Sequence, residues 1–425
     1  MNKTSLEIKQ GIKTHIVKTD LFKTNLICVI ITVPLNRENV TKNALIPFML
    51  RRGTANLNDQ SLINKELENM YGATFNCGVD KFGDNQVLKF YIESIDDFYT
   101  LDKNSILNKS INTLLDIVFN PLMENGKFRE DFLNVEKENL RRVIESKIDD
   151  KDSYALDQCI SHMYNNEGFG IYKYGYIEDI EKINIDNLTD HYIKLIQNSK
   201  IDIFLSGSFD EKKVEEELCN NENISKLKPR VENYILNNEF TENKQKIENV
   251  KSVEEKLSVT QGKLIIGVDI LLSIENLQCI SLVYNAILGD GVNSMLFQNV
   301  REKAGLAYSA KSTYIKQKSN IFIKCGIQIE NYDKALTIVK EQLENIKSDG
   351  FTDKDIENAK TYLVSGIRNI ITEQDTEMIF YIGQEISKIE TSIEEYIDKI
   401  NRVTKEQILE LARNIQINTV YFLRN

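Results

Sequence analysis

The sequence predicts an α+β fold of two homologous domains, each a mainly antiparallel sheet covered by helices on one face. In both halves of the chain, apolar strand-like runs recur between segments with helical periodicity. The second half also repeats the order of the first. Superposing Gly72 on Gly305, an offset of 305 − 72 = 233, aligns M-Y-G-A-T-F with K-A-G-L-A-Y. The same offset places Val87–Ile95 over Asn320–Gln328 without a gap, which indicates an internal duplication.

The length of 425 residues exceeds what one ordinary core accommodates, so more than one domain is expected. Between Lys226 and Val250 the chain turns polar and contains Pro229, a pattern typical of a linker. We therefore expect an N-terminal domain over 1–225, a linker over 226–250 and a C-terminal domain over 251–425.

In the first half, Asn25–Pro34 is a continuous β-branched run and predicts a strand buried on both faces. A helix is expected over 41–52 with Thr41 as its cap, although Pro47 in its interior should bend it or remove a hydrogen bond. A second helix over 61–70 is expected to be capped by Ser61. The remaining elements expected here are strands 73–79, 87–95 and 201–205 and helices 106–118, 130–147, 153–165 and 185–196.

In the second half, a strand over 263–272 and a helix over 275–288 lead to the stretch Gly289–Tyr314. There, apolar residues at Val292, Met295, Leu296 and Val300 predict an amphipathic helix that ends at Gly305. The strand that follows should place five residues on one face, namely Leu306, Tyr308, Ala310, Ser312 and Tyr314. A strand over 321–329 and a helix over 332–347 come next.

Composition excludes several classes of protein. The net charge of −11 argues against a nucleic-acid-binding surface, which needs concentrated basic residues. No run of 18 apolar residues exists, so no membrane span is expected, and the N-terminus lacks the apolar run of a signal peptide. Six scattered cysteines, most of them in apolar runs, indicate reduced core thiols. We therefore expect a cytoplasmic protein.

Two blocks carry a family resemblance: L-G-D-G-V-N-S-M-L-F-Q-N-V-R-E-K-A-G-L-A-Y-S at Leu288–Ser309, and R-R-G-T at Arg51–Thr54. With the duplicated architecture, they resemble the insulinase (pitrilysin) metallopeptidases, in the branch of mitochondrial processing peptidase and its bacterial relatives. The resemblance covers nearly the whole chain. It implies two domains arranged as a clamshell, with a zinc motif H-x-x-E-H in the first and an arginine–tyrosine pair in the second.

The zinc motif is missing. Counting back from Gly53-Thr54, its slot holds A-L-I-P-F, with Ala44 and Phe48 at the histidine positions and Pro47 at the glutamate position. The resemblance suggests Glu145 as the third ligand, but one carboxylate cannot hold zinc, which needs three protein ligands and an activatable water. His15, His162 and His191 lack ligand spacing. We expect no metal and no other cofactor in this chain, with zinc in a partner subunit.

The second-domain pair survives as Arg301 and Tyr308, seven residues apart. A tyrosine hydroxyl can donate to the oxyanion of a tetrahedral intermediate, and an arginine can bind a peptide carbonyl or carboxylate. The glycine loop, with Gly289, Gly291, Asn293 and Ser294, is expected to contact substrate through exposed backbone N–H groups. The alternative remains open that Arg301 pairs with a neighbouring glutamate or the helix dipole and that Tyr308 only packs.

Two functions are compatible with these residues. In the first, the chain is the non-zinc subunit of a heterodimeric peptidase, inactive alone, and supplies its Arg/Tyr pair and glycine loop to a zinc-bearing paralogous chain that cleaves peptides. In the second, it is a non-catalytic scaffold or peptide-binding pseudoenzyme in a protein maturation or modification pathway, holding extended peptide at a strand edge. A homodimer is a further possibility when the partner is absent. The first function is preferred.

Overall fold

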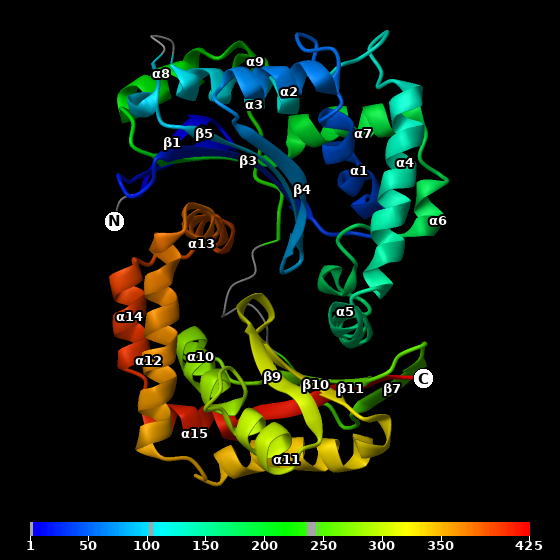
Figure 1. Ribbon diagram of the computed structural model, residues 1–425, viewed down its shortest axis with the longest axis vertical. Coiled ribbons are helices and arrows are strands. Elements are labelled where there is room, and N and C mark those ends of the chain that lie inside the picture. Colours follow the sequence, from blue (N-terminus) through cyan, green and yellow to red (C-terminus); the bar gives the residue numbers. More distant parts are fainter. Residues whose placement is uncertain (1–2, 102–104, 236–243, 245) are drawn as a thin grey trace. The chain divides into compact units, whose positions relative to one another are not determined.

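The computed structural model describes residues 3–101, 105–235, 244 and 246–425, and part of the expected linker, 236–243 and 245, lies outside them. The chain forms two compact units (Figure 1). The first consists of residues 1–145, 171–235 and 372–386, and the second of residues 146–170, 236–371 and 387–425. The expected division into 1–225 and 251–425 therefore differs from the observed one in two segments. Residues 146–170 pack with the second unit, and residues 372–386 pack with the first.

The first unit contains a six-stranded sheet in the order β1-β2-β6-β3-β5-β4. Neighbouring strands are antiparallel except β2 and β6, which are parallel. The strands are β1 (Lys3–Lys9), β2 (Ile12–Lys18), β3 (Thr24–Pro34), β4 (Thr74–Phe82), β5 (Asn85–Ile95) and β6 (Lys200–Gly207).

Helices cover both faces of this sheet (Figure 1). On β3, Ile27, Val29 and Ile31 pack into the large core that α1 and α3 share. The alternate residues Leu26, Cys28 and Ile30 pack with α13. The helices are α1 (Val40–Leu50), α2 (Gln60–Asn69), α3 (Ile106–Phe119), α4 (Glu130–Glu145), α6 (Ile177–Ile180), α7 (Ile185–Asn198), α8 (Glu211–Asn220), α9 (Glu222–Ser225) and α13 (Gln374–Ser387). The strand buried on both faces is confirmed, and α13 covers a face on which no helix was expected.

Helix α13 is joined to this sheet near both of its ends. The amide nitrogen of Gln374 donates to the carbonyl oxygens of Thr24 and Ser206, at 3.1 and 2.9 Å. Toward the other end, Glu385 lies 3.2 Å from the ammonium of Lys200 on β6. These polar contacts fix the helix along the sheet while Met378, Tyr381 and Ile382 pack on it.

Two helix caps in this unit differ from the expected ones. Helix α1 begins after Asn39 rather than at Thr41, and Asn39 makes no side-chain capping bond. Thr41 instead accepts a hydrogen bond from the backbone of Tyr176. Helix α2 is capped by Asp59, whose carboxylate accepts from the backbone N–H groups of Ser61 and Leu62. A carboxylate at this position also interacts favourably with the helix dipole, which explains why it caps in place of Ser61.

The second unit contains a five-stranded sheet in the order β7-β11-β8-β10-β9. Its neighbours are antiparallel except β7 and β11, which are parallel. The strands are β7 (Lys251–Lys256), β8 (Gly262–Ile270), β9 (Ala307–Ile315), β10 (Asn320–Ile327) and β11 (Ile415–Arg424). Strands β4 and β9 each form one edge of their sheet, and they begin at Thr74 and Ala307, which are 307 − 74 = 233 residues apart.

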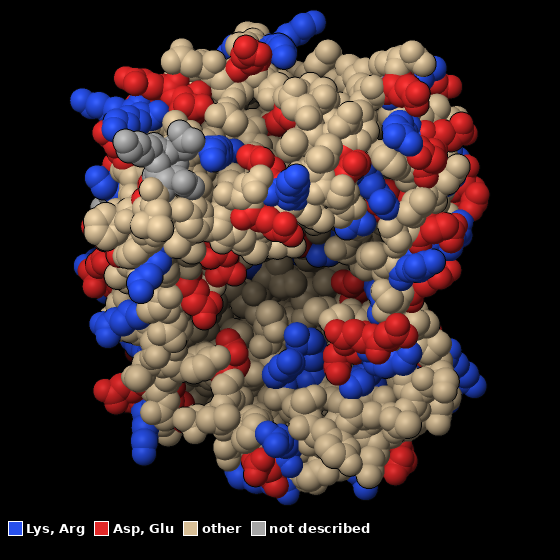
Figure 2. All heavy atoms as spheres, turned by 45° about the horizontal axis from the view of Figure 1, so that its top comes forward, with Lys and Arg blue, Asp and Glu red and all other residues tan. Residues whose placement is uncertain are grey.

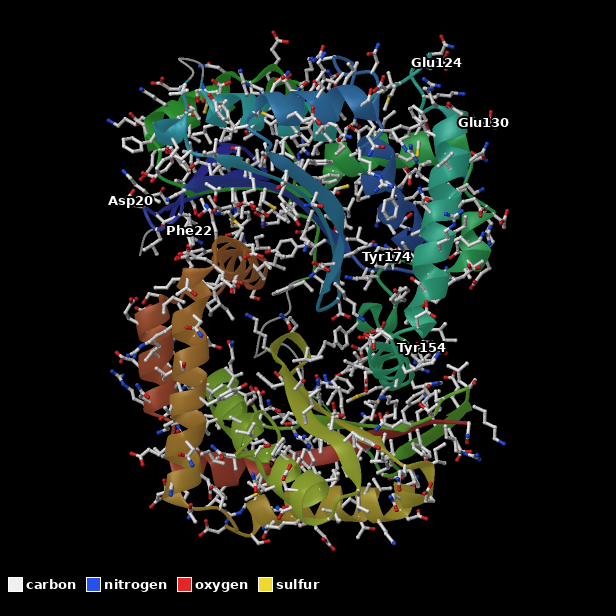
Figure 3. The ribbon with its side chains drawn as sticks, in the orientation of Figure 1. Asp20, Phe22, Glu124, Glu130, Tyr154 and Tyr174 are labelled. Carbon is white, nitrogen blue, oxygen red and sulfur yellow. The ribbon has the colours of Figure 1, made fainter. Side chains whose placement is uncertain are left out.

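The helices of this unit are α5 (Lys151–Met163), α10 (Leu277–Leu288), α11 (Tyr332–Lys347), α12 (Asp353–Asn369), α14 (Ile393–Asn401) and α15 (Lys405–Arg413). Helix α5 packs its Ala155, Cys159 and Ile160 with Ile265 and Tyr421 of the sheet. Tyr154 of α5 (Figure 3) donates a 2.6 Å hydrogen bond to Glu255, which also accepts one from Tyr421. An α+β fold with mainly antiparallel sheets is thus confirmed for both units.

Charged side chains of both signs are mixed over the face in Figure 2. All six cysteines carry free thiols; Cys28, Cys159, Cys279 and Cys325 are buried, Cys77 is half-buried and Cys219 is exposed. Burial raises the pKa of the Cys28 thiol to about 12, as expected for an unreactive core cysteine. Among the described residues, no helix combines the length and the apolar character needed to cross a bilayer.

Candidate substrate-binding site

The segment 44–48, where the sequence predicts the slot of the zinc motif, lies on α1 at the hydrophobic core. Ala44 is 1% exposed, and Phe48 packs against the same core cluster. Pro47 lies inside the helix, and its carbonyl accepts from the backbone of Arg51 and from the Cys77 thiol, both at 3.3 Å. A zinc ion needs lone pairs from nitrogen, oxygen or sulfur side chains. Methyl, pyrrolidine and phenyl groups have none, so the residues of this slot do not fit the metal.

A buried carboxylate next to this slot is neutralised by arginines. Glu136 of α4 is completely buried, and its Oε1 lies 2.5 Å from Nε of Arg52. Its Oε2 accepts from the Arg51 guanidinium at 3.2 Å and from the Asn139 amide at 2.9 Å. Arg51 and Arg52 therefore occupy carboxylate oxygens of Glu136 that could otherwise bind a metal ion. Glu145, the position suggested for the third ligand, is exposed at the end of α4.

The histidines occupy three separate environments. The ring of His191 lies 2.6 Å from the Asn43 side-chain oxygen, and burial lowers its pKa to about 4. His162 stacks near Tyr421. His15 is buried against Asp202 at 3.0 Å, and among the described residues only these two and Glu385 form a cluster with metal-ligating atoms close together.

That cluster already contains a cation. The ammonium of Lys200 contacts Asp202 and lies 3.2 Å from Glu385, so both carboxylates are paired. The second nitrogen of His15 lies 2.9 Å from the hydroxyl of Ser5. A metal ion would have to displace a buried lysine to bind here. We conclude that the cluster stabilises the first unit as an ionic network.

The glycine loop follows α10 in the second unit. Gly289 packs so closely on β9 that a Cβ there would lie 2.7 Å from the backbone nitrogen of Ser312, which donates to the Gly289 carbonyl. Ser294 is buried and its hydroxyl donates to the Gly291 carbonyl at 2.7 Å, while Asn293 is exposed. The loop is thus a rigid turn with one exposed amide side chain.

A cavity of about 470 Å³ opens between this loop and α12, and we call it the loop cavity. Its wall includes Gly291, Asn293 and Ser294, but not Gly289, Arg301 or Tyr308. The hydroxyl of Tyr362 on α12 donates to the Asp290 carboxylate at 3.1 Å. Burial nevertheless raises the pKa of Asp290 above its ordinary value. The cavity has the size of a small ligand pocket and could hold a peptide side chain.

Arg301 lies in a π-helix, η4 (Phe297–Lys303). The amphipathic helix expected to contain Val292 and to end at Gly305 is therefore wrong in its start and its type, because only residues from Met295 onward are helical. Val292 is 65% exposed rather than on the buried stripe, whereas Leu296 and Val300 are buried. The Arg301 guanidinium lies 4.6 Å from the Phe297 ring centroid and 3.7 Å from Glu302, with 44% of the side chain exposed. π-Helices are frequent at functional sites.

Tyr308 occupies a β-bulge at the start of β9. Ser309 pairs with Gly326, and the next pair joins Ala307 to Ile327, so Tyr308 is the extra residue of the strand. A bulge redirects the side chain that it contains. Tyr308 is consequently 75% exposed, while Ala310 and Ser312 are buried. The expectation that Tyr308 shares a face with Ala310 and Ser312 is wrong for this reason.

Comparisons with known proteins identify relatives over nearly the whole chain. The chain is 31% identical to "Probable inactive metalloprotease YmfF" of Bacillus subtilis over 415 residues, covering 97% of this chain and 96% of that protein. The chain belongs to the peptidase M16 family. Residues 182–363 match the family described as "Peptidase M16 inactive domain".

Two further proteins are similar over much of the chain. A crystal structure of a conserved protein from Enterococcus faecalis V583 superposes with a TM-score of 0.90 and 26% identity, covering 100% of this chain and 99% of that one. "Uncharacterized zinc protease YmxG" of Bacillus subtilis is 24% identical over 326 residues, 75% of this chain and 76% of that protein. The chain is thus similar both to a protein named as a probable inactive metalloprotease and to one named as a zinc protease.

For this M16 chain, sequence reasoning missed three features of the site. Glu136 gave no signal, because it lies in a helix with many charges and only its burial distinguishes it. Tyr362 and Asp290 are 72 residues apart and meet only because α12 packs along α10. The bulge at Tyr308 could not be read from residue types. By contrast, Gly305 has a φ of +63°, as its position at the helix end predicted.

Proposed function

We propose that this chain is the non-zinc subunit of a two-chain M16 peptidase and supplies substrate-binding groups to a zinc-bearing partner. The observation that carries the proposal is an asymmetry between the two units. In the expected zinc slot, Ala44 and Pro47 are buried and Phe48 packs against the apolar core, whereas Tyr308 is directed to solvent by a bulge. An exposed tyrosine at a bulge has no packing role that would require it, which favours a role in contact with another molecule.

The comparisons give independent support for a second chain. Bacillus subtilis has both a similar protein named as an inactive metalloprotease and one named as a zinc protease. A species that holds both kinds of chain has the components of a pair. We expect the partner of the present chain to be a paralogue with an intact H-x-x-E-H motif, which would supply zinc and the activated water.

In that assembly the residues of this chain bind and orient a peptide. The Tyr308 hydroxyl donates a hydrogen bond to the substrate carbonyl oxygen, and this bond strengthens as the oxygen gains negative charge. Arg301, which has exposed guanidinium surface, binds a second carbonyl or a carboxylate of the peptide. Gly291, Asn293 and Ser294 form the loop-cavity wall that receives a side chain of the same peptide.

The experiment is hydrolysis of a fluorogenic peptide library by three samples: this chain, a zinc-motif paralogue from the same genome, and their mixture. We expect turnover in the mixture only. Tyr308→Phe should lower the turnover of the mixture by about 100- to 1,000-fold, the cost of losing one oxyanion donor. The matched control is Tyr99→Phe, an exposed tyrosine of the first unit, and it should leave turnover unchanged.

Two results would overturn the proposal. The first is a paralogue that is fully active alone and unchanged on mixing, which would support the scaffold or peptide-binding function instead. The second is turnover with stoichiometric zinc in this chain alone. Size-exclusion chromatography with light scattering on each sample distinguishes a heterodimer from a homodimer.

A further inference from the structure

Another cavity of about 470 Å³ lies in the first unit, and we call it the α1–α7 cavity. It opens where the loop before α1 meets α7, and Pro34 at the end of β3 forms part of its wall. All residues of the wall belong to the first unit. Among the described residues of this wall, none belongs to the segment 44–48 or to the glycine loop. The proposed function therefore leaves this cavity without a role.

Two buried amide side chains determine which nitrogen of His191, a residue of this wall, carries the hydrogen. The side-chain nitrogen of Gln86 donates to the backbone carbonyls of Val40 and Lys173, at 3.1 and 2.7 Å. Gln86 therefore presents its oxygen to the Asn43 amide nitrogen at 2.8 Å, and Asn43 presents its own oxygen to Nε2 of His191 at 2.6 Å. Because an amide oxygen only accepts, the hydrogen of the neutral imidazole is on Nε2 and Nδ1 has a lone pair.

The imidazole of His191 is neutral at pH 7. Burial, followed by the charges of Lys42 and Lys194, lowers its pKa to about 4. Within the described part of the chain, Nδ1 of His191 has no hydrogen-bond partner. A half-buried acceptor of this kind is unfavourable unless water or a ligand supplies a donor. A hydroxyl group of a ligand in the cavity would be such a donor.

Two lysines of the wall, Lys42 of α1 and Lys194 of α7, lie close enough to His191 to influence its charge. In the part of the chain that the structure describes, neither ammonium has a carboxylate within 4.0 Å. Asp190 precedes Lys194 by four residues on α7, a spacing suited to an ion pair, but its charge acts on Lys127 outside the wall. The positive charge beside His191 is thus left to solvent or to a bound anion.

Hydration of a surface helix does not account for the whole wall. It explains Lys194 taken alone, because an exposed lysine on a helix is common. Lys42, however, is half-buried, and Asn39 precedes α1 without capping it. The side chains of Asn39 and Asn233 make no hydrogen bond to any other described residue. A half-buried cation, an acceptor without a donor and two free amides thus line one cavity.

The composition of the wall indicates the class of ligand. Six of its fifteen residues are asparagines, and the exposed carboxylates of Glu38 and Asp190 add acceptors, so hydroxyl groups can be bound from several sides. Among the described residues of the wall, His191 has the only aromatic ring, so a nucleotide base has little surface on which to stack. Lysine binds phosphate as a point charge. The volume also exceeds that of a phosphate ion and is typical of a small-molecule site.

We propose that the α1–α7 cavity binds a phosphorylated sugar or polyol, whose phosphate is bound by Lys42 and Lys194 and one of whose hydroxyls donates to Nδ1 of His191. The free amides of Asn39 and Asn233 bind further hydroxyls of the same ligand. Binding needs no second chain, so this inference goes beyond the proposed function and does not depend on it.

The test is isothermal titration calorimetry of the full chain with four compounds: glucose 6-phosphate, glucose, inorganic phosphate and adenosine monophosphate. We expect glucose 6-phosphate to bind at least about tenfold more tightly than glucose, which has no charge for the lysines to pair. Inorganic phosphate should bind roughly tenfold more weakly than glucose 6-phosphate, because it lacks the hydroxyls that the imidazole and the amides accept or donate to. Adenosine monophosphate should also bind more weakly than glucose 6-phosphate, because its base has little surface on which to stack.

The variants separate the phosphate contacts from the hydroxyl contact. Lys42→Gln and Lys194→Gln should each lower the affinity for both glucose 6-phosphate and inorganic phosphate by roughly tenfold. His191→Phe keeps a ring but removes Nδ1, so it should lower the affinity for glucose 6-phosphate and leave that for inorganic phosphate unchanged. Lys65→Gln, at an exposed lysine of α2 outside the wall, is the matched control and should change neither. Thermal unfolding verifies the fold of each variant, and the two lysine variants still decide if His191→Phe does not fold.

Four results would overturn the inference. The first is the absence of binding heat for glucose 6-phosphate at millimolar concentration, and the second is equal affinity for glucose 6-phosphate and glucose. The third is an equal loss of affinity in Lys65→Gln and in the two wall-lysine variants, which would indicate an unspecific effect of charge. The fourth is tighter binding of adenosine monophosphate than of glucose 6-phosphate, which would assign the cavity to a nucleotide. All titrations use this chain alone, so peptide turnover with a paralogue neither supports nor contradicts them.

Discussion

The Arg52 guanidinium lies 2.5 Å from the Glu136 carboxylate and joins the end of α1 to α4. The same carboxylate accepts from Arg51, so a completely buried anion is balanced by two partly exposed cations. This cluster stands next to Ala44, Pro47 and Phe48, where the zinc peptidases of the resemblance have their motif. Helices α1 and α4 are held together by this ion pair and by apolar packing. The segment 44–48 is therefore not an empty metal site.

Introducing the H-x-x-E-H motif should therefore not restore zinc binding. In the triple variant Ala44→His, Pro47→Glu, Phe48→His, one imidazole ring replaces the methyl group of Ala44, which is 1% exposed, and Glu136 stays bound to arginine. We expect no stoichiometric zinc by elemental analysis. We also expect a loss of roughly 2–5 kcal/mol in the free energy of unfolding, from overpacking and buried polar groups. One equivalent of tightly bound zinc with unchanged stability would show that the slot is still a ligand cage.

Removing the charge of Glu136 should unfold the chain more easily. In Glu136→Gln, Arg51 and Arg52 lose their buried counterion, and we expect a cost of roughly 2–4 kcal/mol in urea unfolding. The control is Glu138→Gln on the same helix, whose exposed carboxylate lies 3.4 Å from Arg141 and should contribute little. Equal losses of unfolding free energy in the two variants would contradict this prediction. They would mean that Arg51 and Arg52 are hydrated without a loss of stability when Glu136 is replaced.

Much of the fold could be predicted because apolar periodicity reports local structure directly. The strand β3 and the helix α3 lie within two residues of their expected bounds, since both have long apolar patterns. The exchange of segments between the units could not be predicted. Helix α5 and helix α13 have ordinary amphipathic patterns, and nothing in such a pattern states which sheet the apolar face will meet.

The candidate site was predictable where residue type alone decides the chemistry. That Ala44, Pro47 and Phe48 cannot bind zinc follows from their residue types, and in the structure all three lie in or against apolar surroundings. The orientation of Tyr308 was not predictable, because the bulge depends on how β9 registers with β10. Strand pairing is a tertiary property, and one residue of slippage reverses every side chain.

Protonation of Asp202 at low pH should lower the stability of the first unit. Burial opposes its charge, but Lys200 and the hydrogen bond from His15 outweigh that effect and hold the pKa of Asp202 below its usual value of about 3.9. A depressed native pKa means that Asp202 contributes its full stabilisation above about pH 4 and loses it as the pH falls through the native value. We expect Asp202→Asn to cost roughly 3 kcal/mol at pH 7.

Urea unfolding of wild type and Asp202→Asn at several pH values checks this prediction. The difference in unfolding free energy should be constant from pH 8 to pH 5 and should shrink only below about pH 4. The exposed Asp186, paired with Lys127, is the control, and its substitution by asparagine should change little. A difference that grows with acidification would contradict the depressed pKa, because it would require Asp202 to be favoured in its protonated form.

Substitution of two glycines of the second unit by alanine should change the free energy of unfolding in opposite directions. At Gly289 the new Cβ would lie 2.7 Å from the backbone nitrogen of Ser312, so the loop or β9 must move. We expect a loss of roughly 1–3 kcal/mol and a displaced glycine loop. At Gly366, exposed on α12, an alanine Cβ would have no heavy atom within 4 Å apart from its chain neighbours and the backbone of its own helix, and the substitution should stabilise by about 0.4–1 kcal/mol.

Thermal and urea unfolding of the two variants give the stability changes, and turnover of the fluorogenic peptides by the mixture with the paralogue gives the effect on the loop. Gly289→Ala should also weaken any peptide that enters the loop cavity, since Gly291, Asn293 and Ser294 follow directly after the displaced residue. Gly366→Ala should leave peptide binding unchanged, because its position is on an exposed helix surface. If Gly289→Ala were as stable as wild type, the close approach of the loop to β9 would not constrain the site.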